Sequence, residues 1–256
     1  MGIYNCASTL QEALDSLYAQ TYQDFEIILC DDGSTDNTHQ IAYENLQKHP
    51  NIVLLKNPQN MGLNKTLNNC LAVAKGEYIA RMDGDDLCDP TRFEKELDFL
   101  EAHPEYSIVS CAMTQFDEDG EFARTSSREG EPTKEAFAYG PPFCHAPCMV
   151  RKESYDAVGG YTVDKRLLRV EDYHLWMKMF EKGYRGWNLP EYLYHMRDDR
   201  NATHRRTFKS RLNGMYACRL AYTKLHFSTC GFLKCYILTF IKGILPIFIY
   251  EYFHKK

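Results

Sequence analysis

The sequence predicts an α/β fold built on a mostly parallel sheet. Between residues 25 and 82, three short apolar runs alternate with two segments that carry apolar residues at helical spacing. This alternation implies crossover connections, which place consecutive strands parallel in one sheet. Two of the apolar runs, 25–30 and 77–82, stop directly before clusters of aspartate. Ligands of open α/β sheets bind at such strand ends, so these clusters are the first candidates for a site.

The elements follow in order along the chain. A helix is expected from Leu10 onward, because apolar residues recur there at helical spacing after Ser8 or Thr9 as a cap. No apolar strand precedes it, so the first strand of the sheet is expected to be missing. The other predicted helices span 38–48, 63–74 and 91–103, and the predicted strands span 25–30, 51–55, 77–82 and 107–113. Residues 115–131 are expected to form a polar connection, and the chain is expected to turn basic and helical after Pro190.

Composition places the chain among globular proteins. It has 256 residues, of which 44% are hydrophobic and 25% charged. The start of the chain does not resemble a signal peptide, because residues 10–24 are amphipathic and acidic. The ten cysteines are scattered, and the close pair Cys144 and Cys148 lacks a second matching pair. This spacing argues against a zinc site and favours reduced thiols in the cytosol.

Two acidic clusters carry the chemistry. The first contains Asp31 and Asp32, and the second contains Asp83, Asp85 and Asp86. Neighbouring carboxylates repel one another, and a hard divalent metal with a bound phosphate is their usual compensation. A single cluster of this kind would be better interpreted as a polar turn, since Asp-Gly is a common turn dipeptide. Two clusters at two strand ends favour a binding site.

Seven short segments also stand in a telling order: Tyr4-Asn5, Gln20-Thr21-Tyr22, Asp31-Asp32-Gly33-Ser34-Thr35-Asp36, Asn60-Met61-Gly62-Leu63, the stretch 76–86, Gly159-Gly160-Tyr161 and the stretch 171–176. Together they resemble family 2 glycosyltransferases with the GT-A fold, of the capsule, O-antigen and exopolysaccharide type. The resemblance covers residues 1 to about 205. It implies an inverting enzyme that moves a sugar from a nucleotide donor.

The second cluster resembles the metal-binding Asp-X-Asp segment of that family. Mn²⁺ or Mg²⁺ is the implied cofactor, and it would neutralise the diphosphate as the sugar leaves. We assign the metal to Asp85 and Asp86, and contacts with the nucleotide to Asp83 and Asp85. The pair that touches the metal does not follow from the sequence.

The first cluster would bind the nucleoside. A carboxylate can accept the ring N–H of uracil and the hydroxyls of ribose, which suits Asp31 and Asp32. Tyr4 offers a face on which the base can stack, although it also reads as an ordinary half-buried tyrosine. Relatives carry an arginine five residues after Gly62, where this chain has Leu67, so Lys65 is the cation nearest to the nucleotide.

The catalytic base is predicted in the pair Glu171 and Asp172. A sugar hydroxyl is a poor nucleophile at pH 7, so a carboxylate must take its proton during the attack. Asp172 is the candidate base, and Glu171 would orient the acceptor or the start of the helix. The alternative is that both residues merely complement the dipole of a helix over 173–181.

Two further residues are weaker candidates. His145 resembles a histidine of the family that lines the donor or acceptor site, but a lone histidine is often structural. Arg197 stands where relatives carry a Tyr-Arg before a flexible segment, and it could close over the pyrophosphate. A solvated basic loop, or one that faces phospholipid, explains Arg197 equally well.

The C-terminal part of the sequence is both basic and hydrophobic. Residues 200–256 contain eleven Lys or Arg and one acid, whereas residues 1–199 carry a net charge of −15. The stretch 232–253 is interrupted by charges and Pro246, so it contains no uninterrupted apolar run long enough to span a bilayer. An interfacial helix pair on an anionic membrane and a helix packed on the domain are both consistent with it.

These observations give one functional hypothesis and two rivals. The hypothesis is a GT-A domain over residues 1–205 with a helical tail over 206–256, peripheral at the inner face of the cell membrane. It would add a single sugar, from a UDP-sugar donor as the resemblance implies, to a growing or lipid-linked glycan. The Gln-X-X-Arg-Trp pattern of processive relatives is absent. No nucleic-acid partner is expected. The rivals are an inactive sugar-nucleotide-binding relative and a metal-dependent nucleotidyltransferase, although residues 1–20 lack the cations that the latter needs.

Overall fold

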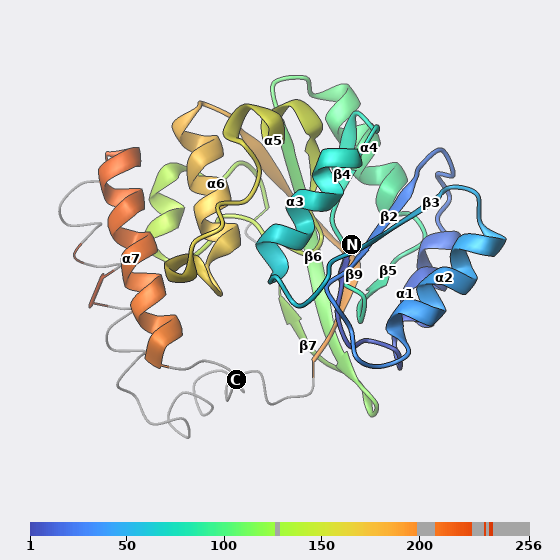
Figure 1. The fold of residues 1–256 in the computed structure, drawn as a ribbon. Helices are drawn as coiled ribbons and strands as arrows, with labels where there is room; N and C mark the ends of the chain where they lie inside the picture. Colours follow the sequence, from blue (N-terminus) through green and yellow to red (C-terminus); the bar gives the residue numbers. More distant parts are fainter. Residues whose placement is uncertain (126–128, 199–207, 227–232, 234–235, 238–256) are drawn as a thin grey trace.

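The structure is a computed structural model that describes residues 1–125, 129–198, 208–226, 233 and 236–237 (Figure 1). Within these residues the strands form two sheets. One is three-stranded, in the order β1-β2-β3, and the other is six-stranded, in the order β4-β8-β6-β9-β5 with β7 beside β6. The α/β class is therefore confirmed, and the described strands are divided between a parallel half and a mixed half.

The first sheet matches the predicted alternation. Its strands are β1 (Gly2–Ile3), β2 (Ile27–Asp31) and β3 (Ile52–Lys56), all parallel, and its helices are α1 (Leu10–Tyr18), α2 (Thr38–Lys48) and α3 (Leu63–Val73). One prediction is corrected here. The expected absence of a first strand was wrong, because Gly2 and Ile3 pair with Cys30 and Asp31 of β2. Two residues are too short to give an apolar periodicity that a sequence could reveal.

The second sheet is mostly antiparallel. Its strands are β4 (Tyr78–Ala80), β5 (Leu87–Cys88), β6 (Ile108–Asp117), β7 (Gly120–Thr125), β8 (Met149–Arg151) and β9 (Gly186–Arg197). Among these strands only the pair β6 and β9 is parallel. The predicted parallel arrangement therefore holds for the first sheet alone, because a hairpin joins β6 to β7 and β8 returns antiparallel to both β4 and β6.

Two local predictions were wrong. The polar connection expected at 115–131 is largely strand, because β6 continues to Asp117 and β7 follows after a tight turn. The helical character expected after Pro190 is also absent at first, since β9 runs through Pro190 to Arg197. The register of β9 against β6 shifts between Leu189 and Tyr192, so Pro190 lies at a bulge, where a missing N–H is tolerated.

The remaining helices cover the second half. They are α4 (Arg92–Ala102), α5 (Lys152–Val158), α6 (Glu171–Glu181) and α7 (Phe208–Leu225), with short 3₁₀ turns η1 (Lys134–Ala138) and η2 (Lys165–Leu167). In Figure 1, α6 and α7 lie side by side at one end of the molecule, and α1 and α2 lie at the other. Ala217, Ala221 and Leu225 of α7 share a core with Trp176 and Met179 of α6.

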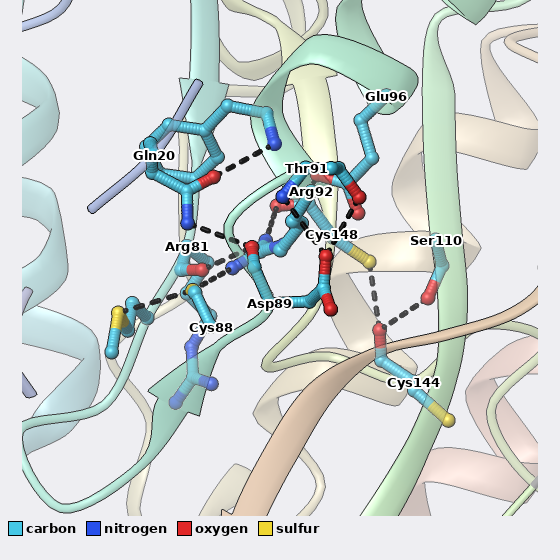
Figure 2. A network of polar contacts seen from close by, with 12 residues as sticks. Gln20, Arg81, Cys88, Asp89, Thr91, Arg92, Glu96, Ser110, Cys144 and Cys148 are labelled. Carbon is cyan, nitrogen blue, oxygen red and sulfur yellow. Dashed lines mark hydrogen bonds and ion pairs between the residues drawn. The ribbon is translucent and has the colours of Figure 1, made fainter. Parts of the chain in front are cut away.

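A buried polar network joins α4 to both halves of the fold (Figure 2). Arg92 and Glu96 are fully buried, and Arg92 Nε lies 3.2 Å from Glu96 Oε2. The same guanidinium donates to the carbonyl of Arg81 at 3.1 Å. Burial raises the pKa of Glu96 to about 7, against the opposing charge of Arg92. Arg92 thus fixes the chain just before the second acidic cluster.

Most of the predicted basic tail lies outside the described residues, including nearly all of the stretch 232–253 that was expected to seek the membrane. Within the described part of the chain, none of the helices combines the length and the apolar character that a membrane span requires.

Candidate active site

Both acidic clusters lie where strands end, and one short segment of the chain separates them. Asp31 is the last residue of β2, and the second cluster lies between β4 and β5. The backbone N–H of Asp32 donates to the carbonyl of Ile3 at 2.9 Å, and Thr9 Oγ1 donates to the carbonyl of Gly84 at 3.1 Å. The segment 3–9 therefore contacts both clusters and connects them.

Gly84 is required for this close approach. A Cβ atom at this position would stand 2.9 Å from Cys6 Sγ and 3.1 Å from a methyl carbon of Ile3. Such contacts are shorter than side chains tolerate, so a larger residue would push the second cluster away from the segment 3–6. The glycine between the carboxylates is a packing requirement of this edge of the sheet.

Asp32 holds the loop before α3. Its side chain is buried and accepts three hydrogen bonds: from Asn57 Nδ2 at 2.8 Å, from Met61 N at 2.8 Å and from Gly62 N at 2.9 Å. Both carboxylate oxygens are thereby engaged with the protein. These contacts favour a positioning role for Asp32, whereas its predicted contact with the nucleoside stays a prediction.

Asp31 has one oxygen to offer. The residue is fully buried, and its Oδ1 accepts a hydrogen bond from Ser34 N at 2.9 Å. Its Oδ2 lies 3.2 Å from His39 Nδ1 without hydrogen-bond geometry, and within the described part of the chain neither atom has a hydrogen-bond partner. A buried carboxylate oxygen without a donor is costly unless a ligand or water supplies one. Asp31 therefore keeps one oxygen that the protein does not satisfy with a hydrogen bond, and its predicted contact with the nucleoside stays a prediction.

Tyr4 and Lys65 lie near the first cluster, and their side chains form no hydrogen bond or ion pair with the residues that the structure describes. Tyr4 is 46% exposed in the segment between the clusters, and neighbouring Asn5 adopts a left-handed conformation with φ of 48°. Asn5 is held on both sides, since its N–H donates to Ser34 Oγ and its Oδ1 accepts from Thr35 N. Lys65 is exposed in the first turn of α3, beside the loop that Asp32 holds.

Asp86 stabilises the fold through hydrogen bonds to both of its carboxylate oxygens. Its buried carboxylate accepts from the Tyr194 hydroxyl at 2.7 Å and from the backbone N–H of Arg197 at 2.8 Å, so it fastens the cluster to β9. Burial, followed by the charges of Asp83 and Asp85, raises its pKa to about 7. A carboxylate that is enclosed and engaged on both oxygens is a poor choice for a metal. The contacts of Asp86 therefore favour positioning over the predicted metal ligation.

Asp83 and Asp85 are the members of this cluster that reach solvent. Asp83 Oδ1 pairs with Arg81 Nη2 at 2.6 Å, which leaves Asp83 Oδ2 for a ligand. The Asp85 side chain is exposed, although partial desolvation and the charge of Asp83 raise its pKa. Among the described residues, no group of three or more Asp, Glu, His or Cys side chains could hold a metal ion by itself. A metal that keeps phosphate and water ligands needs just one or two carboxylates, and this pair fits that demand.

Arg81 is a site residue that the sequence did not single out. It lies just beyond β4, is 7% exposed, and its Nε has no hydrogen-bond partner. Besides pairing with Asp83, its charge acts on the carboxyl of Asp172 and on the ring of His145. Arg81 therefore connects the second cluster electrostatically to the start of α6. An arginine inside an apolar run directly before three aspartates was the signal that could have found it.

Asp172 and Glu171 begin α6. Burial, followed by the charge of Glu171, raises the pKa of Asp172 to about 6, while Arg81 opposes the shift. Such a pKa leaves the group ionised at neutral pH and close to the value of an effective general base. Glu171 Oε2 is buried without a hydrogen-bond partner. The simple dipole role for this pair does not account for these two features.

His145 is tied into a group of aromatic side chains. Its Nε2 lies 2.7 Å from the Tyr161 hydroxyl, and its ring packs at the edge of Trp176, with 6.0 Å between ring centroids. Burial and the nearby charge of Arg81 hold the pKa of His145 well below its usual value, so the ring is neutral. These contacts indicate that His145 forms part of a wall of the site. Its predicted contact with the donor or the acceptor stays a prediction.

Arg197 closes one side of the second cluster. Its guanidinium pairs with Glu12 of α1, donates from Nε to the carbonyl of Asp85 at 2.9 Å and lies 4.5 Å from the ring centre of Phe116. It therefore anchors the loop that carries the second acidic cluster. The alternative of a purely solvated basic loop does not hold for Arg197 itself.

Comparison with known proteins decides the family. Residues 1–159 match the family model described as Glycosyl transferase family 2. The chain belongs to glycosyltransferase family 2. Over its whole length it is 40% identical to EpsE of Bacillus subtilis (strain 168), which is named as a glycosyltransferase, and it covers 92% of that protein. It is thus an enzyme of the exopolysaccharide-type branch, as the motifs predicted.

Other relatives are similar over shorter spans or at lower identity. The family 2 chain is 27% identical to the amylovoran biosynthesis glycosyltransferase AmsE of Erwinia amylovora, over 96% of this chain and 92% of AmsE. The solved structure of S. aureus TarS 1–349 in complex with UDP-GlcNAc superposes with a TM-score of 0.75 at 19% identity, over 94% of this chain and 70% of TarS. This superposition confirms the GT-A fold.

Proposed function

We propose that this glycosyltransferase moves a single sugar from a UDP-sugar donor to a growing or lipid-linked glycan, with inversion at the anomeric carbon. The observation that carries the proposal is the pairing of two unlike acidic sites through one buried cation. Arg81 bonds Asp83 in the metal-site loop and acts on Asp172 at the start of α6. A donor diphosphate and an acceptor hydroxyl need these two functions side by side.

The donor would lie across the two clusters. Asp31 accepts the ring N–H of the base, and Tyr4 stacks on it. The segment between the clusters then carries the ribose toward Asp83 and Asp85, with Lys65 near the nucleotide. Asp83 and Asp85, in place of the originally predicted Asp85 and Asp86, would hold Mn²⁺ or Mg²⁺, which neutralises the diphosphate as it leaves. The solved mannosyltransferase PcManGT, with a TM-score of 0.68 at 21% identity over 96% of this chain and 69% of that protein, is in complex with GDP-Man and Mn²⁺.

The acceptor would meet Asp172. Its carboxylate takes the proton of the attacking hydroxyl while the new bond forms on the face opposite the leaving diphosphate, which inverts the anomeric centre. The raised pKa of Asp172 suits it to this transfer near neutral pH. Glu171 orients the acceptor, and neutral His145 with Tyr161 forms a wall that excludes water from this side.

The choice of a UDP donor and a lipid-linked acceptor follows the names of relatives. WfaP of Escherichia coli is named as a glucosyltransferase from UDP-Glc to α-D-GlcNAc-diphosphoundecaprenol, and it is 31% identical over 72% of this chain and 70% of WfaP. An acceptor of that kind would bring the enzyme to the inner face of the cell membrane. The basic residues of 200–256 would add attraction to anionic lipid, at about 1 kcal/mol each near the surface.

A donor screen tests the proposal. Purified enzyme with Mn²⁺ is offered UDP-Glc, UDP-Gal, UDP-GlcNAc and GDP-Man together with GlcNAc-diphosphate-lipid analogues. Release of nucleoside diphosphate is measured, and the linkage of the product is determined by NMR. We expect acceptor-dependent release with a UDP-sugar and a β-linked product from an α-linked donor. Release that is independent of acceptor with every donor, or a product that retains the α configuration, would contradict the proposal.

A further inference from the structure

The chain directly after α5 forms a joint between α3 and α6, over residues 158–162. Gly159 caps α5 with φ of 70°, and Gly160 continues in the left-handed region with φ of 62°. Glycine adopts this backbone without strain, so the joint can turn tightly. In Figure 1, α3 lies between the first sheet and the helices α5 and α6, and its side chains bond the joint.

Asn68 of α3 holds the joint by the backbone of a single residue. Its Nδ2 donates to the carbonyl of Tyr161 at 2.8 Å, and its Oδ1 accepts from the N–H of Tyr161 at 2.8 Å. Asn64, one turn earlier on α3, donates to the carbonyl of Thr162 at 2.8 Å. A carboxamide both donates and accepts, whereas a carboxylate accepts only, so asparagine suits this paired contact.

The same joint is held by α6 from its other side. Lys178 Nζ donates to the carbonyl of Val158 at 2.9 Å and to that of Gly160. A Cβ atom at Gly160 would stand 2.5 Å from Asn68 Oδ1, so α3 and the joint approach as closely as a backbone without a side chain allows. Lys178 lies in the same helix as Asp172, within two turns of it. The joint therefore connects Asn68 to the helix that presents Asp172.

Tyr161 carries this contact into the candidate active site. Its ring is buried and shares a core with Tyr173 and Trp176 of α6. Its hydroxyl lies 2.7 Å from Nε2 of His145, which forms part of a wall of the site. A shift of the Tyr161 backbone would move these side chains, because a close-packed interior transmits such displacements.

Another side of α3 is tied to the first acidic cluster. Asn69, the next residue of the helix, donates from Nδ2 to Asn57 Oδ1 at 2.8 Å. Asn57 in turn donates to Asp32, which also accepts from the N–H of Gly62 at the start of α3. Residues 57–62 are called the donor loop below. Successive residues of a helix point about 100° apart, so Asn68 and Asn69 connect one rigid element to two different parts of the site.

We propose that Asn68 is a positioning residue for the transfer reaction. Through the backbone of Tyr161 it sets the place of α6, and with it the carboxylate of Asp172, relative to the donor loop. The inference rests on the proposed function, in which Asp172 takes the proton of the acceptor while the first cluster binds the donor. A displacement of about 1 Å between reacting groups can cost roughly 100-fold in rate.

Asn68→Asp tests the inference, since it keeps the size of the side chain and loses the donor to the Tyr161 carbonyl. Transfer is assayed with Mn²⁺, a GlcNAc-diphosphate-lipid analogue and whichever of UDP-Glc, UDP-Gal, UDP-GlcNAc and GDP-Man the wild type uses. We expect kcat to fall about 30-fold, whereas the affinity for the matching nucleoside diphosphate, measured by calorimetry, should stay within about twofold. Asn68→Ala removes both hydrogen bonds without adding a charge and should lower kcat to a similar extent.

The same substitution at the next residue supplies the matched contrast. Asn69→Asp adds an equal charge to α3 but removes the donor to Asn57, which holds the donor loop. It should weaken nucleotide binding by about fivefold or more and change kcat at saturating donor by less than about threefold. The two neighbouring variants should therefore show opposite patterns of binding and turnover.

A second arm tests whether Asn68 acts through Asp172. In the Asp172→Asn background, Asn68→Asp should lower the remaining transfer by less than about threefold, because the group that it positions no longer accepts the proton. Hydrogen exchange gives a readout that needs no donor. The amides of residues 174–178 should exchange faster in Asn68→Asp, and those of the donor loop should not.

The outcomes separate the inference from the proposed function. Wild-type transfer by Asp172→Asn alone would contradict the proposed base, whatever the Asn68 variants do. The inference is overturned by folded Asn68 variants that keep kcat within about threefold, by equal losses of kcat and nucleotide affinity, by a full further loss in the Asp172→Asn background, or by unchanged exchange in α6. Loss of the fold in both Asn68 variants, seen in thermal melts, would show a purely structural residue and would also overturn it.

Discussion

The two acidic clusters use their carboxylates in a similar way but are anchored differently. In each, one carboxylate holds the protein together. Asp32 binds amide donors that lie 25 to 30 residues further along the chain, at Asn57, Met61 and Gly62. Asp86 binds Tyr194 and the N–H of Arg197, which lie 108 and 111 residues away. The first anchor is thus local, and the second depends on the closure of the whole domain.

The carboxylates left for a ligand also differ. Asp31 is fully buried with one oxygen that lacks a donor, which suits recognition of a neutral N–H or hydroxyl. Asp83 and Asp85 reach solvent and lie beside a cation, which suits a metal ion and a diphosphate. Neighbouring carboxylates of one acidic motif therefore need not share a role, because in each cluster one carboxylate is engaged by the protein itself.

The largest effect is expected at Asp172, the candidate base, which lies outside both acidic clusters and would act on the acceptor while the clusters hold the donor. Asp172→Asn should lower transfer by about 10² to 10⁴-fold, since it keeps the shape and removes the proton acceptor. Affinity for UDP, measured by calorimetry, should stay near that of the wild type. Asp156→Asn, at an exposed carboxylate of α5, is the matched control and should retain full activity. Equal loss of binding and transfer would make Asp172 a structural residue.

The pH profile sharpens the same assignment. Because the pKa of Asp172 is raised to about 6, its base form predominates above that pH and is lost below it. kcat/KM should therefore fall about tenfold per pH unit below 6 and level off above it. A profile that stays flat down to pH 5 would contradict a base with this pKa.

The second cluster provides the next effect. Asp85→Asn should lower transfer by roughly 100-fold through the loss of charge opposite the leaving diphosphate, with little change in Tm. Asp86→Ala should instead lower the free energy of unfolding by about 2 kcal/mol or more, because Tyr194 and the N–H of Arg197 lose their acceptor. Activity assays with Mn²⁺ and thermal melts of both variants separate these outcomes. The reverse pattern would show that the roles have been exchanged.

The first cluster should show a smaller contrast. Asp31→Asn should weaken UDP binding by about tenfold, since it removes one charged acceptor for the base. Asp32→Asn should cost about 2 kcal/mol of stability, because its amide cannot accept all the bonds that hold the loop before α3. Calorimetry and chemical denaturation measure the two effects. A stable Asp32→Asn variant that fails to bind UDP would return Asp32 to the nucleoside site.

The smallest effect is expected where the second cluster meets β9. Tyr194→Phe removes the hydroxyl that donates to Asp86 at 2.7 Å and keeps the buried ring. The expected loss is about 1 kcal/mol, or roughly 2–4 °C in Tm, with kcat reduced less than by Asp85→Asn. An unchanged melt would mean that the hydroxyl contributes nothing to anchoring the cluster.

The sequence was sufficient where structure depends on local periodicity. The bounds of α2 agree with the predicted range 38–48, α3 ends one residue earlier than predicted, and α4 is one residue shorter than predicted at each end. Prediction from the sequence failed where the secondary structure depends on pairing between segments that are far apart in the chain. Residues 120–125 and 190–197 become strands because β6 offers them an edge on either side, which no local pattern reveals.

The same distinction between local pattern and tertiary contact applies to the candidate site. The acidic residues were found because each cluster follows its strand directly in the sequence. The contacts that distinguish the members of each cluster could not be read from the sequence, since Asp86 is engaged by Tyr194, more than a hundred residues away. Arg81 was missed for a related reason, because its influence on Asp172 arises from tertiary folding alone.

Metal-dependent nucleotide binding tests the central claim most directly. UDP is titrated calorimetrically into the wild type, Asp85→Asn and Asp86→Asn, each with and without Mn²⁺. We expect Mn²⁺ to tighten UDP binding to the wild type and to folded Asp86→Asn, whereas Asp85→Asn should keep just the weaker, metal-independent binding. Full Mn²⁺ enhancement in Asp85→Asn, or its loss in Asp86→Asn with the fold intact, would contradict the division of carboxylates between ligand and protein.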